Sequence, residues 1–308
     1  MLMKIAFLIS TNKDARHLRD LINSLPDDAD YYVHVDSKRD LLHFENMVRR
    51  QNVTFIRNRV DVVPGSISEV NVQVELLRKS LDAANYDYLV YLCGSDYPLW
   101  SNERINSFFA NVNGKQILSG IAMVGQGKAA YPYCDFRLLA GHSWRSNSLK
   151  AKARGALRNA LNLASIHKTL RIHCPLKTYM LYKGAASWAI TPELGYQVVS
   201  EWDENAQLKE YFSTSYRPVE TFVPTVALNS EFASQCTIVK GRYKGVDALS
   251  QLTYIDGAPE PKVLTEVDFN AIKDEDKMFC RKVVTDYSDG LKSMIDADRE
   301  NKNLNKQS

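Results

Sequence analysis

The chain has 308 residues, of which 45% are hydrophobic and 24% are charged, the composition of a globular protein with an ample core. Its 39 Lys and Arg residues nearly balance its 36 Asp and Glu residues, and a formal net charge of +3 argues against a nucleic-acid-binding protein. The five cysteines are widely spaced and form no Cys-x-x-Cys pair, so neither a disulfide framework nor a zinc site is indicated.

The first residues lead directly from Lys4 into an apolar segment at 5–9. This segment is too short to span a membrane, and no signal-peptide cleavage pattern follows it. We therefore expect a cytoplasmic protein with reduced thiols.

The first hundred residues alternate apolar runs with amphipathic stretches, the pattern of a parallel sheet covered by helices. Strands are predicted at 5–9, 31–35, 53–57 and 88–92, and helices at 14–25 and 68–84. Parallel strands place their carboxyl ends at one edge of a sheet, so the polar residues that follow these strands should converge there. These residues are Ser10, Thr11, Asp36, Ser95 and Asp96.

The fourth strand ends in a motif with two interpretations. The apolar run that begins at Tyr88 stops at Gly94-Ser95-Asp96 and turns at Pro98. A carboxylate at the carboxyl end of a buried strand is typical of a ligand site in open α/β sheets. The same residues are also typical of an ordinary exit from a strand into a loop.

The segment 143–171 combines many Lys and Arg residues with regularly spaced leucines, which predicts a basic amphipathic helix. It is either the solvated face of an ordinary surface helix or a peripheral contact with an anionic membrane surface or an acidic glycan. Further along, a strand is predicted at 183–191, a helix from Pro192, a helix after Glu220 and a strand that ends near Asp256. The last residues, 298–308, are polar and are expected to form a frayed tail.

Six short segments between residues 4 and 284 are informative as an ordered set. They are Val33-His34-Val35-Asp36-Ser37-Lys38, Leu92-Cys93-Gly94-Ser95-Asp96-Tyr97-Pro98-Leu99, Lys183-Gly184-x-x-Ser187-Trp188-Ala189-Ile190-Thr191, Pro218-Val219-Glu220-Thr221-Phe222, Leu252-Thr253-Tyr254-Ile255-Asp256 and Phe279-Cys280-Arg281-Lys282. In this order they resemble the core-2/I-branching β-1,6-N-acetylglucosaminyltransferase family, which also contains the peptide xylosyltransferases.

The resemblance implies a Rossmann-like α/β fold of the glycosyltransferase A type, with a single central, mostly parallel sheet flanked by helices. It also implies inverting chemistry on a UDP-sugar without a metal ion. A metal-dependent enzyme of this fold would carry an Asp-x-Asp pair at the end of a strand to hold a hard cation. The Asp-x-Asp pairs of this chain, at 28–30, 274–276 and 296–298, do not end apolar runs. We therefore expect neither a metal nor any other cofactor.

Without a cation, the charge that develops on the leaving diphosphate must be met by basic side chains. The resemblance assigns this role to Lys262, Arg281 and Lys282. Inversion needs one base that removes the proton of the acceptor hydroxyl, and the resemblance assigns that role to Glu220. Family members often have Asp-Glu at this point, whereas this chain has Val219-Glu220. The alternative for Glu220 is a carboxylate that favours the positive end of a helix.

The remaining site residues follow from the same resemblance. Asp36 would read the uracil or ribose, with Ser10 and Thr11 at the border of the nucleotide pocket. Asp96 and Trp188 would contact the donor sugar, and Asp135 and Arg137 lie where the family has residues that contact the acceptor. For Asp36 a plain turn-forming aspartate is the alternative, and for Trp188 a core tryptophan.

Taken together, these features predict one glycosyltransferase domain over 1–297, with a nucleotide-binding half at 1–110 and an acceptor- and diphosphate-binding half at 111–297. The expected acceptor is a glycan or lipid-linked saccharide in surface polysaccharide synthesis. One alternative is another Rossmann-like nucleotide-dependent enzyme, although the turn after the first strand lacks Gly-x-Gly-x-x-Gly. The other alternative is a non-catalytic carbohydrate-binding protein.

Overall fold

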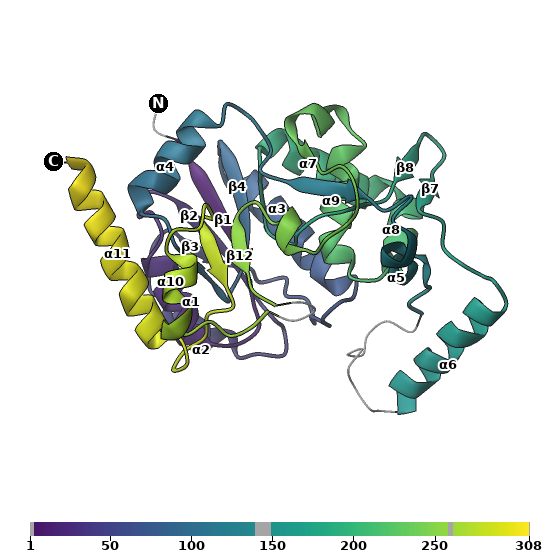
Figure 1. The fold of residues 1–308 in the computed structure, drawn as a ribbon, viewed down its shortest axis with the longest axis horizontal. Helices are drawn as coiled ribbons and strands as arrows, with labels where there is room; N and C mark the ends of the chain where they lie inside the picture. Colours follow the sequence, from purple (N-terminus) through teal and green to yellow (C-terminus); the bar gives the residue numbers. More distant parts are fainter. Residues whose placement is uncertain (1–2, 139–148, 258–260, 308) are drawn as a thin grey trace.

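A five-stranded sheet runs through the middle of the molecule in the computed structural model, which describes residues 3–138, 149–257 and 261–307 (Figure 1). Its strands, in the order β10-β4-β1-β2-β3, are Trp188–Ile190, Tyr88–Cys93, Ile5–Thr11, Asp30–Val35 and Val53–Phe55. Strands β4, β1, β2 and β3 are parallel to one another, and β10 is antiparallel to β4. The predicted α/β fold with a single central, mostly parallel sheet is confirmed.

Helices cover both faces of this sheet, which explains why its strands are almost continuously apolar. Along β1, Leu8 belongs to the hydrophobic cluster on one face, while Phe7 and Ile9 belong to the cluster on the other face. The first face is covered by α3 (Ser68–Ala83), α7 (Pro192–Glu204) and α9 (Phe222–Leu228). The second face is covered by α1 (Ala15–Asn23), α4 (Asn102–Asn111) and α11 (Asp289–Gln307).

Shorter elements surround this core. The remaining α-helices are α2 (Leu41–Met47), α5 (Tyr131–Cys134), α6 (Leu149–Leu163), α8 (Ala206–Ser213) and α10 (Phe269–Ile272). The remaining strands are β5 (Asp96–Pro98), β6 (Ser119–Ala122), β7 (Arg171–His173), β8 (Thr178–Met180), β9 (Tyr182–Lys183), β11 (Thr237–Ile238), β12 (Thr253–Ile255) and β13 (Phe279–Arg281). The short 3-10 helices are η1 (Gly127–Ala130), η2 (Pro218–Glu220), η3 (Glu231–Gln235), η4 (Asp247–Leu249) and η5 (Glu266–Asp268).

A small sheet of order β12-β13-β5 joins the end of the chain to the loop after β4. Strand β13 is antiparallel to β5, and in this register Arg281 lies opposite Asp96. The motif after the fourth strand is therefore not a plain loop, because Asp96 to Pro98 form a strand of their own. This pairing brings residues from the two ends of the chain to the carboxyl edge of the central sheet.

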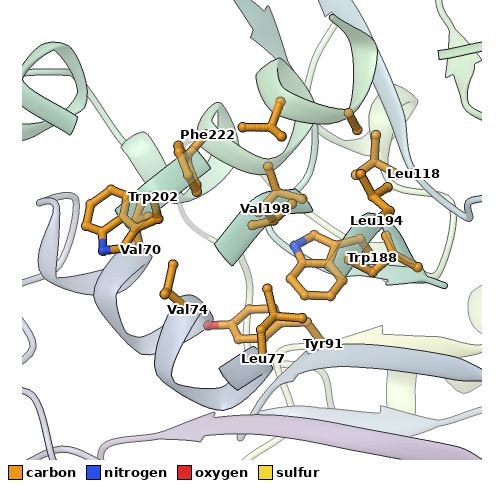
Figure 2. Packing of buried hydrophobic residues seen from close by; sticks show 14 of the residues in the cluster. Val70, Val74, Leu77, Tyr91, Leu118, Trp188, Leu194, Val198, Trp202 and Phe222 are labelled. Carbon is orange, nitrogen blue, oxygen red and sulfur yellow. The ribbon is translucent and has the colours of Figure 1, made fainter. Parts of the chain in front are cut away.

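Trp188 lies in the core, which corrects its predicted role at the donor sugar (Figure 2). Its side chain is 0% exposed, and its ring stacks on Tyr91 with centroids 5.2 Å apart and an interplanar angle of 21°. Leu194 and Val198 of α7 belong to the same cluster (Figure 2). A ring enclosed in this way has no face left for a sugar, and its role is to fix β10 against the sheet.

Two predicted segments differ in the structure. The polar residues from Asp298 onward do not form a frayed tail, because α11 continues to Gln307 and the Arg299 guanidinium donates to the carbonyl oxygens of Ser24 and Trp100. Helix α6 covers only Leu149–Leu163 of the predicted basic helix at 143–171, and 139–148 lie outside the described residues. Lys168, within the predicted basic helix, lies beyond the end of α6 and is buried.

In the part of the chain that the structure describes, no helix is both long enough and apolar enough to cross a membrane.

Candidate functional site

A cleft of about 460 Å³ opens at the carboxyl edge of the central sheet. It is lined by residues 10–14, 93–95 and 281–284, together with Val62, Pro64, Glu69, Tyr91, Ala186 and Val219. These residues come from the ends of β1, β4 and β13, from the start of α3 and from the segments before β10 and α9. The predicted convergence of the strand ends is confirmed: Gly94 N donates to Ser10 O at 2.8 Å, and Asp36 N donates to Thr11 O at 2.9 Å.

Backbone geometry holds the first loop of the cleft in place. A Cβ atom at Gly94 would lie 2.6 Å from Cβ of Thr11, so only glycine lets β4 end this close to β1. Asp14 adopts a left-handed conformation with a φ of 65° and caps α1 by accepting from His17 N. The same carboxylate accepts from Thr285 N at 2.8 Å and from Thr285 Oγ1 at 2.6 Å, which ties the loop after β1 to the segment after β13.

Three cationic side chains line the cleft: Lys13, Arg281 and Lys282. Neither lysine ammonium has a side-chain hydrogen bond or ion pair with another described residue. Arg281 is paired with Asp96 but still reaches the cleft wall. Positive charge that the protein does not neutralise, in a cleft at the carboxyl edge of a sheet, suits an anionic ligand such as a diphosphate.

Asp96 lies behind Arg281 rather than in the wall of the cleft, which corrects its predicted contact with the donor sugar. Its side chain is 0% exposed, and its two oxygens accept from Nε and Nη2 of Arg281, the latter at 2.8 Å. Oδ2 also accepts from Cys93 N at 3.0 Å. Burial alone would lower the pKa of Arg281, but the charge of Asp96 outweighs it and raises that pKa above its ordinary value. Asp96 therefore orients and holds a cation.

Lys262 does not line the cleft, in contrast to its predicted place among the diphosphate-binding residues. Its side chain is half exposed, and its ammonium is hydrogen-bonded to Asp268 at 2.5 Å. Its backbone is nevertheless close to the site, because Lys282 N donates to Lys262 O at 3.3 Å. The backbone of Lys262 therefore lies near the cleft, while its side chain pairs with Asp268 instead of lining the cleft.

Glu220, the predicted base, ends η2 and belongs to an ion triad beside the cleft. Arg217, which precedes η2 in a left-handed conformation with a φ of 44°, donates from Nη1 to Oε1 at 3.2 Å. Lys183 Nζ donates to Oε2. Lys183 is only 3% exposed and Glu220 13%, so the triad is shielded from solvent, and Val219 carries the same segment into the cleft wall. The sequence indicated no role for Lys183 or Arg217, although Lys183 begins one segment of the ordered set and Arg217 directly precedes another.

Glu69 in the first turn of α3 is a cleft residue that the sequence did not reveal. Its Oε2 accepts from Gly65 N at 2.8 Å, and no described residue forms a hydrogen bond with Oε1. Burial raises the pKa of Glu69 to about 7, and although the Gly65 hydrogen bond opposes this, the charge of Glu220 adds to it. Its only sequence signal, an acidic residue near a helix N-terminus, is shared with most helices.

We expect Glu69→Gln to stabilise the protein at pH 8 but hardly at pH 4. Because the folded-state pKa lies above that of an unfolded glutamate, the native state keeps a proton that the unfolded state releases, so stability falls as pH rises toward 7. At pH 8, a pKa shift of this size lowers the free energy of unfolding by about 3 kcal/mol. A glutamine carries no titratable group, so the variant does not incur this loss. Urea denaturation of both proteins at the two pH values measures the difference.

The matched control is Glu201→Gln on α7. There, burial is outweighed by hydrogen bonds from Tyr179, Asn205 and Lys177, so the pKa of Glu201 is lowered. Removing that carboxylate should therefore reduce stability at pH 8, whereas Glu69→Gln should increase it. An equal response of both variants to pH would contradict the assignment for Glu69.

Of the predicted nucleotide residues, Ser10 and Thr11 line the cleft, whereas Asp36 lies just behind it. Oδ1 of Asp36 accepts from Lys38 N at 3.1 Å and pairs with Lys38 Nζ at 3.0 Å. Val62, which does line the cleft, approaches the same oxygen with its backbone N–H at 3.5 Å. Asp36 thus shapes the turn at this wall, and its contact with a uracil or ribose stays a prediction.

Asp135 and Arg137, the predicted acceptor residues, do not line the cleft. Their side chains pair at 3.5 Å, and the Arg137 guanidinium lies 4.9 Å from the ring centre of Tyr216, next to Arg217. Asp135 lines a second cavity of about 420 Å³ with Tyr131, Cys134, Asn162 and His167. The contact of Asp135 and Arg137 with an acceptor stays a prediction.

The Asp-x-Asp pairs of the sequence do not line the cleft, whose described carboxylates are those of Asp14 and Glu69. Within residues 3–138, 149–257 and 261–307, no group of three His, Cys, Asp or Glu side chains is placed to hold a metal ion.

Comparison with known proteins gives a family and distant relatives. Human xylosyltransferase 1 is 23% identical over 237 residues, which cover 74% of this chain and 22% of that protein. The Drosophila melanogaster xylosyltransferase oxt is 26% identical over 125 residues, 38% of this chain and 14% of that protein. The chain thus matches about a quarter or less of the length of these curated relatives.

Among solved structures, glucosyl-3-phosphoglycerate synthase from Mycobacterium tuberculosis is similar over 81% of this chain and 74% of that chain. The TM-score is 0.37 and the sequence identity is 13%. The family model of the Core-2/I-branching enzymes matches residues 5–129, which include the strand ends that build the cleft. Residues 5–129 of the chain are thus similar to the Core-2/I-branching enzymes, which confirms the resemblance carried by its motifs, and the xylosyltransferases are distant homologues of the chain.

Proposed function

We propose that this protein is an inverting, metal-independent glycosyltransferase that moves a sugar from a UDP-sugar to an acceptor hydroxyl and forms a β-linkage. The observation that carries the proposal is the cleft itself, where Lys13, Arg281 and Lys282 gather beside the ion triad of Glu220. The match of residues 5–129 to the family model of the Core-2/I-branching enzymes supports it. The transferred sugar is N-acetylglucosamine or a related sugar, with xylose and a hexose as the alternatives.

In this mechanism the acceptor oxygen forms its bond to the anomeric carbon while the bond from that carbon to the diphosphate breaks. Glu220 takes the proton of the acceptor hydroxyl in the same step. The negative charge that moves onto the diphosphate is met by Arg281 and Lys282, together with Lys13, which also lines the cleft. Fixed cations held in place before the reaction need no reorganisation as this charge develops.

The acceptor we propose is a glycan or lipid-linked saccharide, and the pathway is surface polysaccharide synthesis at the cytoplasmic side of a membrane. Support for this part comes from analogy with the family alone.

A screen of UDP-sugars tests the donor. We expect UDP and one UDP-sugar, at about a hundred times the dissociation constant, to raise the melting temperature by about 5 °C, since a ligand that binds only the native state stabilises it. Hydrolysis or transfer of that donor should proceed at the same rate with and without EDTA. Loss of activity on chelation would contradict the metal-free mechanism.

The matched control pair is Lys282→Gln in the cleft and Lys240→Gln on the exposed surface. Only the first should weaken UDP binding, by about tenfold, because it removes a direct charge contact with the diphosphate. If oligosaccharides raise the melting temperature and no UDP-sugar does, the protein is a carbohydrate-binding protein and the proposal fails.

A further inference from the structure

Helix α6 carries an apolar stripe that faces solvent. Its exposed residues are Leu149, Ala153, Ala156, Leu157, Ala160 and Leu163, followed by Ala164 just beyond the helix. Their spacing of three and four residues places them on a single face of the helix. Leu149 and Leu163, at the two ends of the stripe, are 84% and 90% exposed, so no described part of the chain covers it. The helix stands away from the central sheet at one end of the molecule (Figure 1).

The polar side of the same helix faces the protein. Arg154 is buried, Asn162 Nδ2 donates to Asp135 Oδ1 at 3.2 Å, and Arg158 Nε lies 4.0 Å from Asp135 Oδ2. An ordinary surface helix buries its apolar face and exposes its polar face. Helix α6 is oriented the other way, and a contiguous apolar surface exposed in this manner marks an interaction site.

The charge around the stripe has one sign. Residues 136–192 contain ten Lys and Arg and no Asp or Glu, in a chain whose net charge is only +3, and of these ten Arg154, Lys168 and Lys183 are buried. Lys152 is exposed at the edge of the stripe, and Ile166 continues its apolar character beyond the helix end. A second copy of this chain would bring the same cations against one another, which disfavours self-association through this face.

We propose that α6 lies on an anionic phospholipid membrane, with its leucines and alanines at the boundary of headgroups and acyl chains. An exposed apolar helix face with a cation at its edge, in a segment rich in basic residues, has the composition that binds such surfaces. The attachment of its polar face to Asp135 fixes the helix on the outside of the body, so docking requires no rearrangement of the sheet or the cleft. This surface is independent of the proposed chemistry and would be present whatever reaction the cleft performs.

Co-sedimentation of the full chain with vesicles tests the proposal. We expect binding to vesicles of phosphatidylcholine with 30% phosphatidylglycerol, and at least tenfold weaker binding to phosphatidylcholine alone. Raising the salt concentration should weaken the binding to the anionic vesicles. Leu149→Ser/Leu163→Ser should reduce binding at least tenfold, because two large apolar side chains no longer enter the interface. Lys152→Gln should reduce it about fivefold.

The matched control is Leu42→Ser/Val267→Ser, which removes two exposed apolar side chains, 65% and 84% exposed, outside α6. It should bind vesicles like the unchanged protein. All four proteins should melt at the same temperature, since the substituted side chains are exposed. The proposal is overturned if the anionic vesicles are not bound, or if both double variants lose binding equally. It is also overturned if light scattering finds a dimer that only the α6 variant disrupts, because the stripe would then be a protein interface.

Discussion

Glu220→Gln is expected to lower the rate of sugar transfer about a thousandfold while leaving the affinity for UDP within a factor of two. A glutamine cannot take the proton of an attacking hydroxyl, and general base catalysis contributes about 10²–10⁴-fold. The amide occupies nearly the same volume, so the neighbouring cleft wall at Val219 should keep its shape. Steady-state kinetics with the donor found in the UDP-sugar screen, together with calorimetric titration of UDP, measures both quantities.

The variant also leaves Lys183 buried without its anion, so stability must be measured alongside activity. Glu201→Gln is the matched control. Glu201 is likewise a largely buried carboxylate, 15% exposed and paired with Lys177 at 3.1 Å, but it lies on α7 outside the cleft. It should lose stability and keep its transfer rate. If Glu220→Gln turned over normally, or if Glu201→Gln lost as much activity, Glu220 would not be the base.

The central sheet was predictable because its signal is local. A parallel strand buried on both faces must be apolar at nearly every position, and Ile5–Thr11 and Tyr88–Cys93 are. The convergence of the strand ends then follows from the topology, since parallel strands share an edge. Short edge elements such as β5 and α2 have too few residues for a periodic pattern, and they were missed.

The direction in which a side chain faces was much harder to predict. The motif around Trp188 is compatible with a sugar-binding ring and with a core ring, and only the packing of α7 over β10 decides between them. Likewise, Glu69 is an ordinary first-turn carboxylate in the sequence. Its burial and its proximity to Glu220 depend on how η2 packs against α3, about 150 residues apart along the chain.

The charges of α6 illustrate the same limit. Its composition predicted an amphipathic helix, and a helix at Leu149–Leu163 is present. The sequence alone favoured an exposed charged face, whereas Arg154 is buried and the leucines face solvent. Which side of an amphipathic helix is covered depends on what the rest of the chain offers, and here Asp135 offers a carboxylate to the basic side.

Asp96→Asn should destabilise the protein by about 3–5 kcal/mol, the usual effect of removing one partner from a buried ion pair. The pair joins β5 to β13 across 185 residues of chain, and both oxygens of Asp96 are used by Arg281. An asparagine keeps one acceptor for Cys93 N but leaves the guanidinium with an uncompensated charge. Urea denaturation at pH 7 measures this loss. Asp203→Asn is the matched control, because Asp203 also holds an arginine, Arg78, through two hydrogen bonds of 2.9 and 3.0 Å.

That second pair is exposed, so its removal should change stability by less than about 1 kcal/mol. If the two variants were equally destabilised, burial would not be what makes the Asp96 pair strong.

The double variant Asp96→Leu/Arg281→Met separates the structural role of the pair from its role in binding, since it removes both charges and fills similar space. It should recover much of the stability lost in Asp96→Asn, because no buried charge is left unpaired. It should still bind UDP at least tenfold more weakly than the unchanged protein, because the cation itself is gone from the cleft. If this double variant bound UDP as tightly as the unchanged protein, Arg281 would not be a diphosphate-binding residue, and that role would belong to Lys13 and Lys282.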